Sequence, residues 1–151
     1  WVEKGSSYLP SDLNAAYLYA QLEVADKIND RRLAIWDKYY EGLKELKDEG
    51  KIELQVIPEG CKHNAHMFFM KAKDLQERTE LIKYLKENEI QTVFHYIPLH
   101  TAPAGIKYGR FHGEDRYTTK ESERLMRLPM HYALTDEDVE CVIEKIKEFY
   151  K

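Results

Sequence analysis

Two imidazoles and a phenol lie close together in one short stretch of this sequence. His95 and Tyr96 fall at the end of a β-rich segment, and His100 follows two residues after Pro98. Loops that follow strands commonly line binding sites, and imidazole and phenol groups donate hydrogen bonds to sugar hydroxyls or phosphate oxygens. The pattern predicts substrate binding by all three. For His95 and Tyr96 the sequence equally allows an alternative, in which Phe94 and Tyr96 fill the core and His95 bonds a neighbour.

Ser6 and Ser7 precede the first helical pattern, where free backbone N–H groups and the helix dipole favour a phosphate. The signal is weak by itself. Serines in front of a helix are more often caps or solvent-facing linkers. Both interpretations stay open at this point.

Cys61, His63 and His66 spell C-x-H-x-x-H, which are residue types that transition metals prefer. If His66 heads a strand, alternation places His63 and His66 on opposite faces, and no fourth ligand is evident. We therefore predict no metal site, but a turn followed by a histidine that bonds to backbone. Because Cys61 and Cys141 lie far apart and form no C-x-x-C pair, a disulfide framework is not expected either.

Other catalytic signatures are absent from the sequence: it contains no G-x-S-x-G elbow, P-loop or G-x-G-x-x-G fingerprint. His131 could face a cleft, and Arg110, Arg116 and Arg124 could each meet an acidic group, although surface arginines usually do not. Four tyrosines at helical spacing are assigned to packing rather than to ligand stacking: Tyr17, Tyr19, Tyr39 and Tyr40.

The composition predicts one soluble domain over residues 1–151. A chain of 151 residues with 43% hydrophobic residues can bury one sizeable core. Its near-balanced net charge of −4 argues against a nucleic-acid partner. No apolar run approaches the ~20 residues that span a bilayer, and no signal peptide precedes the first helix. We expect a cytoplasmic location, and interpret the start at Trp1 as the interior of a longer polypeptide.

Helices and strands alternate in the predicted secondary structure. A capped start at Ser11 and three-to-four apolar spacing indicate one long helix, or two with a bend, closed by Gly50. The other expected elements are strands at 52–56, 66–70, 92–97 and 128–131, and helices at 74–88, 118–127 and from 135 to the C-terminus. Residues 99–117 form a long connection whose aromatic content favours an ordered, packed loop.

This order predicts an α/β protein of the α+β type. A long N-terminal helix and further helices would pack on a small, mainly antiparallel sheet.

Several segments of the chain carry a family resemblance: Gly5–Leu9, Ser11–Leu13, Asn64–Phe68, His95–His100, Phe111–Arg124 and Leu128–Pro129. Together they resemble the DegT/DnrJ/EryC1/StrS aminotransferases over essentially the whole chain. Within that family the resemblance is closest to the group that aminates dTDP-4-dehydro-6-deoxyglucose with glutamate, for surface polysaccharide synthesis. Ser7 and Leu9 stand where most of the wider family has Asn and Arg, a departure that agrees with the narrower group.

The resemblance implies the C-terminal small domain of a fold-type-I pyridoxal-phosphate enzyme. In such enzymes a lysine forms a Schiff base with the cofactor, and the family places that lysine upstream of Trp1. We therefore expect no catalytic residue here and an inactive isolated chain. The resemblance also implies that Ser6 and Ser7 lie near the cofactor phosphate across a homodimer. It further implies that the stretch 95–100 helps close a nucleotide-sugar site.

Two alternatives of other classes remain. One is a stand-alone α/β module that binds a nucleotide sugar without catalysis. The other is a dimerisation domain, for which the long apolar-striped first helix is the relevant feature.

Overall fold

The computed structural model describes residue 5 and residues 8–151, and its centre is a four-stranded sheet. The strands are β1 (Glu53–Leu54), β2 (Phe68–Lys71), β3 (Val93–Phe94) and β4 (Leu125–Leu128). Their order across the sheet is β1-β2-β4-β3, and each neighbouring pair is antiparallel. The predicted antiparallel sheet is confirmed.

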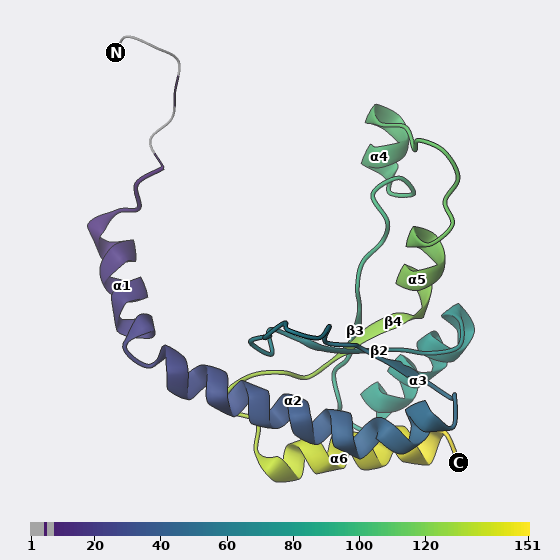
Figure 1. The fold of residues 1–151 in the computed structure, drawn as a ribbon. Coiled ribbons are helices and arrows are strands. Elements are labelled where there is room, and N and C mark those ends of the chain that lie inside the picture. Colours follow the sequence, from purple (N-terminus) through teal and green to yellow (C-terminus); the bar gives the residue numbers. More distant parts are fainter. Residues whose placement is uncertain (1–4, 6–7) are drawn as a thin grey trace.

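Three helices cover one face of the sheet: α2 (Ala25–Asp48), α3 (Leu75–Glu87) and α6 (Asp136–Phe149) (Figure 1). The others extend from this layer: α1 (Asp12–Leu22) continues outward from α2, and α4 (Pro103–Tyr108) and α5 (Thr118–Arg124) rise on the opposite side of the sheet (Figure 1). The predicted mixed class, with helices packed on a small sheet, is confirmed.

Local capping fixes most helix ends where the sequence predicts them. The Ser11 hydroxyl accepts from Asn14 N at 3.3 Å, and the Asp74 carboxylate accepts from Glu77 N at 3.0 Å. Thr135 and Asp138 form a reciprocal capping box at the start of α6. Gly50 follows the end of α2 with φ +73°, a left-handed conformation that glycine adopts without steric cost.

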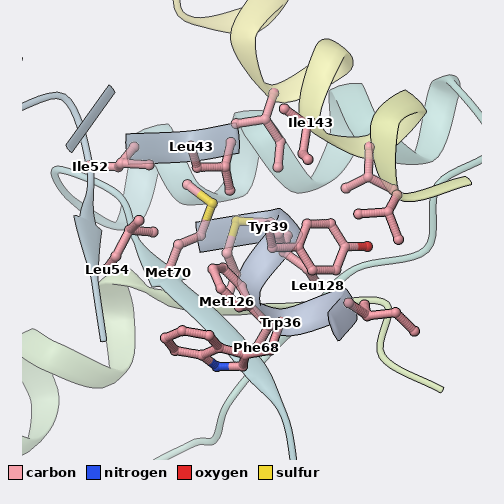
Figure 2. Close-up of a cluster of buried hydrophobic side chains, with 14 of the residues drawn as sticks. Trp36, Tyr39, Leu43, Ile52, Leu54, Phe68, Met70, Met126, Leu128 and Ile143 are labelled. Atoms are coloured by element: carbon pink, nitrogen blue, oxygen red, sulfur yellow. The ribbon is translucent and has the colours of Figure 1, made fainter. Parts of the chain in front are cut away.

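The core lies between the sheet and the three covering helices (Figure 2). Alternation along β2 and β4 turns Phe68, Met70, Met126 and Leu128 toward α2 and α6, and all four are buried. Tyr39 of α2 is also buried, and its hydroxyl donates to the Pro129 carbonyl at 3.1 Å. The face of β4 that carries Arg127 points away from this core.

Several predicted boundaries are wrong. The strands predicted at 52–56 and 92–97 each contain only two paired residues. The helix predicted at 118–127 ends at Arg124, because Leu125 is extended and pairs with Lys71. The last strand therefore occupies 125–128 rather than 128–131. Strand pairing in the sheet overrides the helical spacing of this segment.

The connection at 99–117 also differs from its prediction. It contains α4, which begins at Pro103, a residue suited to the first turn of a helix. Its apolar side chains are largely exposed rather than packed, with Tyr108 at 79% and Tyr117 at 74%.

The first predicted helix is two helices, separated at Glu23 and Val24. Its expected apolar stripe is buried in α2 but not in α1, which has no buried residue. Assignment to packing is correct for buried Tyr39 and for Tyr40, which stacks on Trp36. Tyr17 and Tyr19 are exposed, so they do not belong to the core, and their packing at an interface stays a prediction.

An ion-pair network ties α5 to the first two strands. Lys71 Nζ lies 2.8 Å from carboxylate oxygens of both Glu53 and Glu121. Arg124 pairs with the same two carboxylates and donates from Nε to the Ala72 carbonyl at 2.9 Å. The network holds the base of α5 against the sheet edge at β1 and β2.

This network predicts a loss of stability in acid. Hydrogen bonds from Lys71 and then Arg124 lower the pKa of Glu53 from 4.5 to about 2. Because the folded pKa lies below the unfolded value, Glu53 stabilises the fold fully above pH 4.5 and loses this contribution as the pH falls toward 2. Urea unfolding from pH 6 to 2 should show a smaller decline in Glu53→Gln than in the wild type. Equal declines in the two proteins would contradict this role of Glu53.

Candidate substrate-binding site

His95 and Tyr96 follow the edge strand β3 and meet Arg127 of the neighbouring strand. Val93 pairs with Arg127 in the sheet register, which brings the chain after β3 alongside β4. The His95 and Tyr96 ring centroids are 4.1 Å apart, and the Arg127 guanidinium carbon lies 5.5 Å from the Tyr96 ring centroid. The three side chains form one cluster, which we call the Arg127 cluster.

The Arg127 cluster lies at the surface rather than in the core. Tyr96 is 63% exposed and Phe94 is 43% exposed, so the alternative in which both fill the core is wrong. His95 is partly buried, and its Nδ1 has no hydrogen-bond partner in the described residues, so its alternative bond to a neighbour is not found at that atom. Arg127 Nε is likewise buried without a partner there. Both polar atoms are therefore buried and unpaired within the described residues.

The charge of Arg127 acts on His95. Burial lowers the pKa of the His95 imidazole below its usual value of 6.5, and the nearby Arg127 cation lowers it further. Both effects favour the uncharged imidazole.

Replacing Arg127 by glutamine should raise the pKa of His95, since one of the two causes of its depression is removed. The pKa should stay below 6.5, because burial of the ring remains. An NMR titration of the imidazole resonances measures this shift directly. An unchanged or lower pKa in Arg127→Gln would show that the guanidinium does not act on His95.

His100 lies in a separate cluster at the base of the segment that carries α4. Its Nε2 is 2.8 Å from Asp115 Oδ2 and 3.3 Å from Thr119 Oγ1, and its ring centroid lies 4.5 Å from that of Phe111. Hydrogen bonds from Thr119 and then His100 lower the pKa of Asp115. The contact between His100 Nε2 and the Asp115 carboxylate thus joins the two ends of the segment 100–115.

The structure does not join all the sequence-predicted residues. In the described part of the chain, no hydrogen bond or ring contact connects His100 with His95 or Tyr96. Ser6 and Ser7 lie outside the described residues. The Arg127 cluster and the His100 cluster are therefore two features that follow the same strand.

A cleft of about 830 Å³ lies beside the Arg127 cluster. Its walls come from the end of α3, the start of α6 and the strands β3 and β4, and they include Arg127, Val93, His66 and His131. Lining by His131 confirms the prediction that this residue could face a cleft. Arg127 belongs to both the cleft wall and the cluster.

Sequence reasoning missed Arg127 because the predicted helix at 118–127 included it. A strand assignment to Leu125-Met126-Arg127-Leu128 would have shown a cation between two inward-facing apolar residues. Of the other arginine candidates, Arg124 is engaged in the α5 network and Arg116 pairs with Glu114 at the surface.

The histidines near Cys61 have structural contacts. His63 Nδ1 accepts a hydrogen bond from Ala65 N at 3.3 Å, and its ring lies 4.5 Å from the Trp36 ring. Within residues 5 and 8–151, no three histidine, cysteine or acidic side chains come together as metal ligands. Over the same residues, no helix is both long and apolar enough to cross a membrane.

Two solved structures share this fold. The structure matches S. venezuelae DesV in complex with a ketimine intermediate with a TM-score of 0.88 at 26% identity, over 99% of this chain and 39% of that one. It matches NtdA from Bacillus subtilis with bound cofactor PMP with a TM-score of 0.68 at 26% identity, over 81% of this chain and 28% of that one.

Sequence comparison leads to the same group of proteins. The dTDP-3-amino-3,6-dideoxy-alpha-D-galactopyranose transaminase of Aneurinibacillus thermoaerophilus is 30% identical over 97% of this chain. The chain spans 38% of the length of that relative. The family model for DegT/DnrJ/EryC1/StrS aminotransferases matches residues 2–147. The chain therefore belongs to the DegT/DnrJ/EryC1/StrS aminotransferase family.

Proposed function

We propose that residues 1–151 form a single domain, the C-terminal small domain of a pyridoxal-phosphate-dependent sugar-nucleotide aminotransferase. One observation carries this proposal: the family match covers residues 2–147, although the chain spans little more than a third of its relatives. The remainder of such an enzyme would hold the Schiff-base lysine. The isolated chain should then bind parts of the substrate but transfer no amino group.

The described residues do not by themselves fit pyridoxal phosphate. A Schiff base needs a lysine with an unprotonated amine, which burial away from acids favours. In the described residues no lysine lines the cleft beside Arg127. Lys71 is partly buried, and although burial lowers the pKa of its amine, the carboxylates of Glu121 and Glu53 raise it above the usual value, the opposite of what a nucleophilic amine requires. The cofactor chemistry is therefore assigned to the rest of the enzyme.

The proposed reaction moves an amino group from glutamate to C4 of dTDP-4-dehydro-6-deoxyglucose and yields dTDP-4-amino-4,6-dideoxygalactose. Support for a dTDP sugar comes from two relatives whose names specify dTDP-amino-sugar transaminases. Support for C4 comes from the segment His112–Arg124, which resembles the narrower group most specifically. The product would serve surface polysaccharide synthesis in the cytoplasm, and the complete enzyme would be a homodimer.

The roles of the individual residues follow from this assignment. His95 and Tyr96 would contact the nucleotide sugar, because both follow β3 next to Arg127, which lines the cleft, and Tyr96 is exposed. His100 would act at the same site through its ring or through the position of the α4 segment. Ser6 and Ser7 would bind the cofactor phosphate. No catalytic residue is assigned to the chain.

A coupled assay of the gene's full-length product tests this function. With glutamate and dTDP-4-dehydro-6-deoxyglucose, the enzyme should release 2-oxoglutarate and the 4-amino sugar, and the chain 1–151 alone should release neither. Transfer to a 3-dehydro isomer instead would move the proposal from C4 to C3. No transfer to either sugar, with tight binding of the nucleotide by the chain alone, would favour the stand-alone binding module.

A further inference from the structure

Arg127 differs from the other arginines of the described chain in its surroundings. Most of them donate hydrogen bonds to acceptors of this chain: Arg31, Arg32, Arg78, Arg116 and Arg124. Arg127 and Arg110 make no such bond in the described residues, but Arg110 is exposed and Arg127 is partly buried. Its Nε is closed off from water and unpaired, as is that of Arg78, but Arg78 donates from another nitrogen to the Ser122 carbonyl whereas Arg127 makes no hydrogen bond in the described residues. Buried polar atoms without partners are uncommon in native proteins and call for an explanation.

The position of Arg127 directs its side chain to the open side of the sheet. Its neighbours Met126 and Leu128 face the core, so alternation sends Arg127 to the opposite face. The helices α2, α3 and α6 lie on the core side, whereas the open side is flanked by α5 (Figure 1). The register partners of Arg127 are Phe69 and Val93, which supply no acceptor side chain.

The surroundings of Arg127 orient it without neutralising it. The Tyr96 ring lies against the guanidinium at 5.5 Å, which restricts its plane while leaving its edge free. The two acidic residues that line the cleft, Glu89 and Asp138, lie just after α3 and in α6, on the core side of the sheet. The Asp138 carboxylate already accepts from Thr135 N at 2.9 Å, and neither acid lies within ion-pair distance of Arg127. A cation oriented in this way favours an anionic ligand with two acceptor oxygens.

We propose that Arg127, with His95 and Tyr96, binds an oxyanion of the ligand, a phosphate or a carboxylate group. The guanidinium donates two hydrogen bonds from its edge, and the His95 imidazole donates a third. Tyr96 holds the guanidinium plane. The choice between the two anions rests on the proposed function, since a sugar nucleotide carries a diphosphate and glutamate carries carboxylates.

The experiment titrates the chain 1–151 with inorganic pyrophosphate and, separately, with glutarate, and follows the Arg127 Nε–Hε and His95 ring resonances by NMR. Pyrophosphate represents the diphosphate of a nucleotide, and glutarate represents a dicarboxylate donor without its amine. Shifts caused by one probe alone assign the anion, and shifts caused by both support a general oxyanion site.

Variants separate this site from general charge attraction. Arg127→Gln should weaken binding of the active probe by about tenfold or more, which corresponds to about 1.4 kcal/mol. Arg127→Lys, which keeps the charge but loses the planar fork, should bind with intermediate affinity. Arg110→Gln, the matched loss of an exposed cation, should bind like the wild type.

Three results would overturn the oxyanion site: no shift at Arg127 or His95 with either probe, equal affinities in Arg127→Gln and wild type, or equal losses in Arg127→Gln and Arg110→Gln. The amide spectrum of each variant shows that it is folded. Because no cofactor or amino transfer is measured, failure here leaves the proposed reaction intact, and failure of the reaction leaves the oxyanion site intact.

Discussion

Replacing Phe68 by alanine is expected to lower the free energy of unfolding by about 3–5 kcal/mol, the range for large aromatic truncations in cores. Phe68 is fully buried on β2 at the centre of the core (Figure 2). Its ring packs edge-on against Trp36 at 5.5 Å and lies 5.1 Å from Tyr39, so truncation removes contacts with α2 as well as leaving a cavity. Urea unfolding followed by far-UV circular dichroism measures the change.

Leu18→Ala is the matched control, because it removes an apolar side chain from α1 that is 56% exposed. Its free energy of unfolding should change by less than about 0.5 kcal/mol, as is usual for surface positions. A loss at Leu18 as large as that at Phe68 would mean that α1 is covered in solution by part of this chain or by a second copy.

Arg124→Met is expected to lower the free energy of unfolding by about 1.5–3 kcal/mol, the range for hydrogen bonds to charged groups. The Arg124 side chain is only 15% exposed, and it bonds Glu53, Glu121 and the Ala72 carbonyl at once. Methionine retains much of the apolar stem but leaves the buried carbonyl without this donor. Urea unfolding at pH 7 measures the loss.

Arg116→Met is the matched control for this prediction. Arg116 pairs with Glu114, but its side chain is 73% exposed, so solvent screens the pair. Its free energy of unfolding should change by less than about 0.5 kcal/mol. Equal losses of stability in the two arginine variants would contradict a role of the Arg124 ion pairs in holding α5 against the sheet.

Much of the fold follows from local signals in the sequence. Ser11, Asp74 and Thr135 mark helix starts, and each caps its helix in the structure. Short β-rich segments bounded by turn residues indicate the strands of the sheet. These signals act within a few residues, so they are readable without the rest of the molecule.

What the sequence did not predict depends on distant partners. Thr118 to Arg127 has helical spacing throughout, but Leu125 pairs with Lys71 more than fifty residues away and becomes extended. The stripe of α1 has the period of a buried helix, yet none of the described residues buries it. Apolar residues at helical spacing indicate that one face of a helix can be buried, but they do not indicate which element covers that face.

The candidate site likewise combines features that the sequence predicted with contacts between distant residues that it did not predict. The types and spacing of His95, Tyr96 and His100 indicated a site after a strand, and the structure places His95 and Tyr96 at the surface there. The ion pair of His100 with Asp115 and the contact of Tyr96 with Arg127 could not be predicted from the sequence. Each joins residues that are distant in the sequence and that only the folded chain brings together. Substrate binding by these residues stays a prediction.

The most direct test of the whole account locates the cofactor lysine. The gene's full-length product would be incubated with pyridoxal phosphate, reduced with borohydride, digested and analysed by mass spectrometry, with the chain 1–151 treated in parallel. The account predicts one modified lysine in the full-length product, outside residues 1–151, and no site-specific modification of the chain alone. A specific adduct on a lysine within residues 1–151, or no adduct in the full-length product, would contradict it.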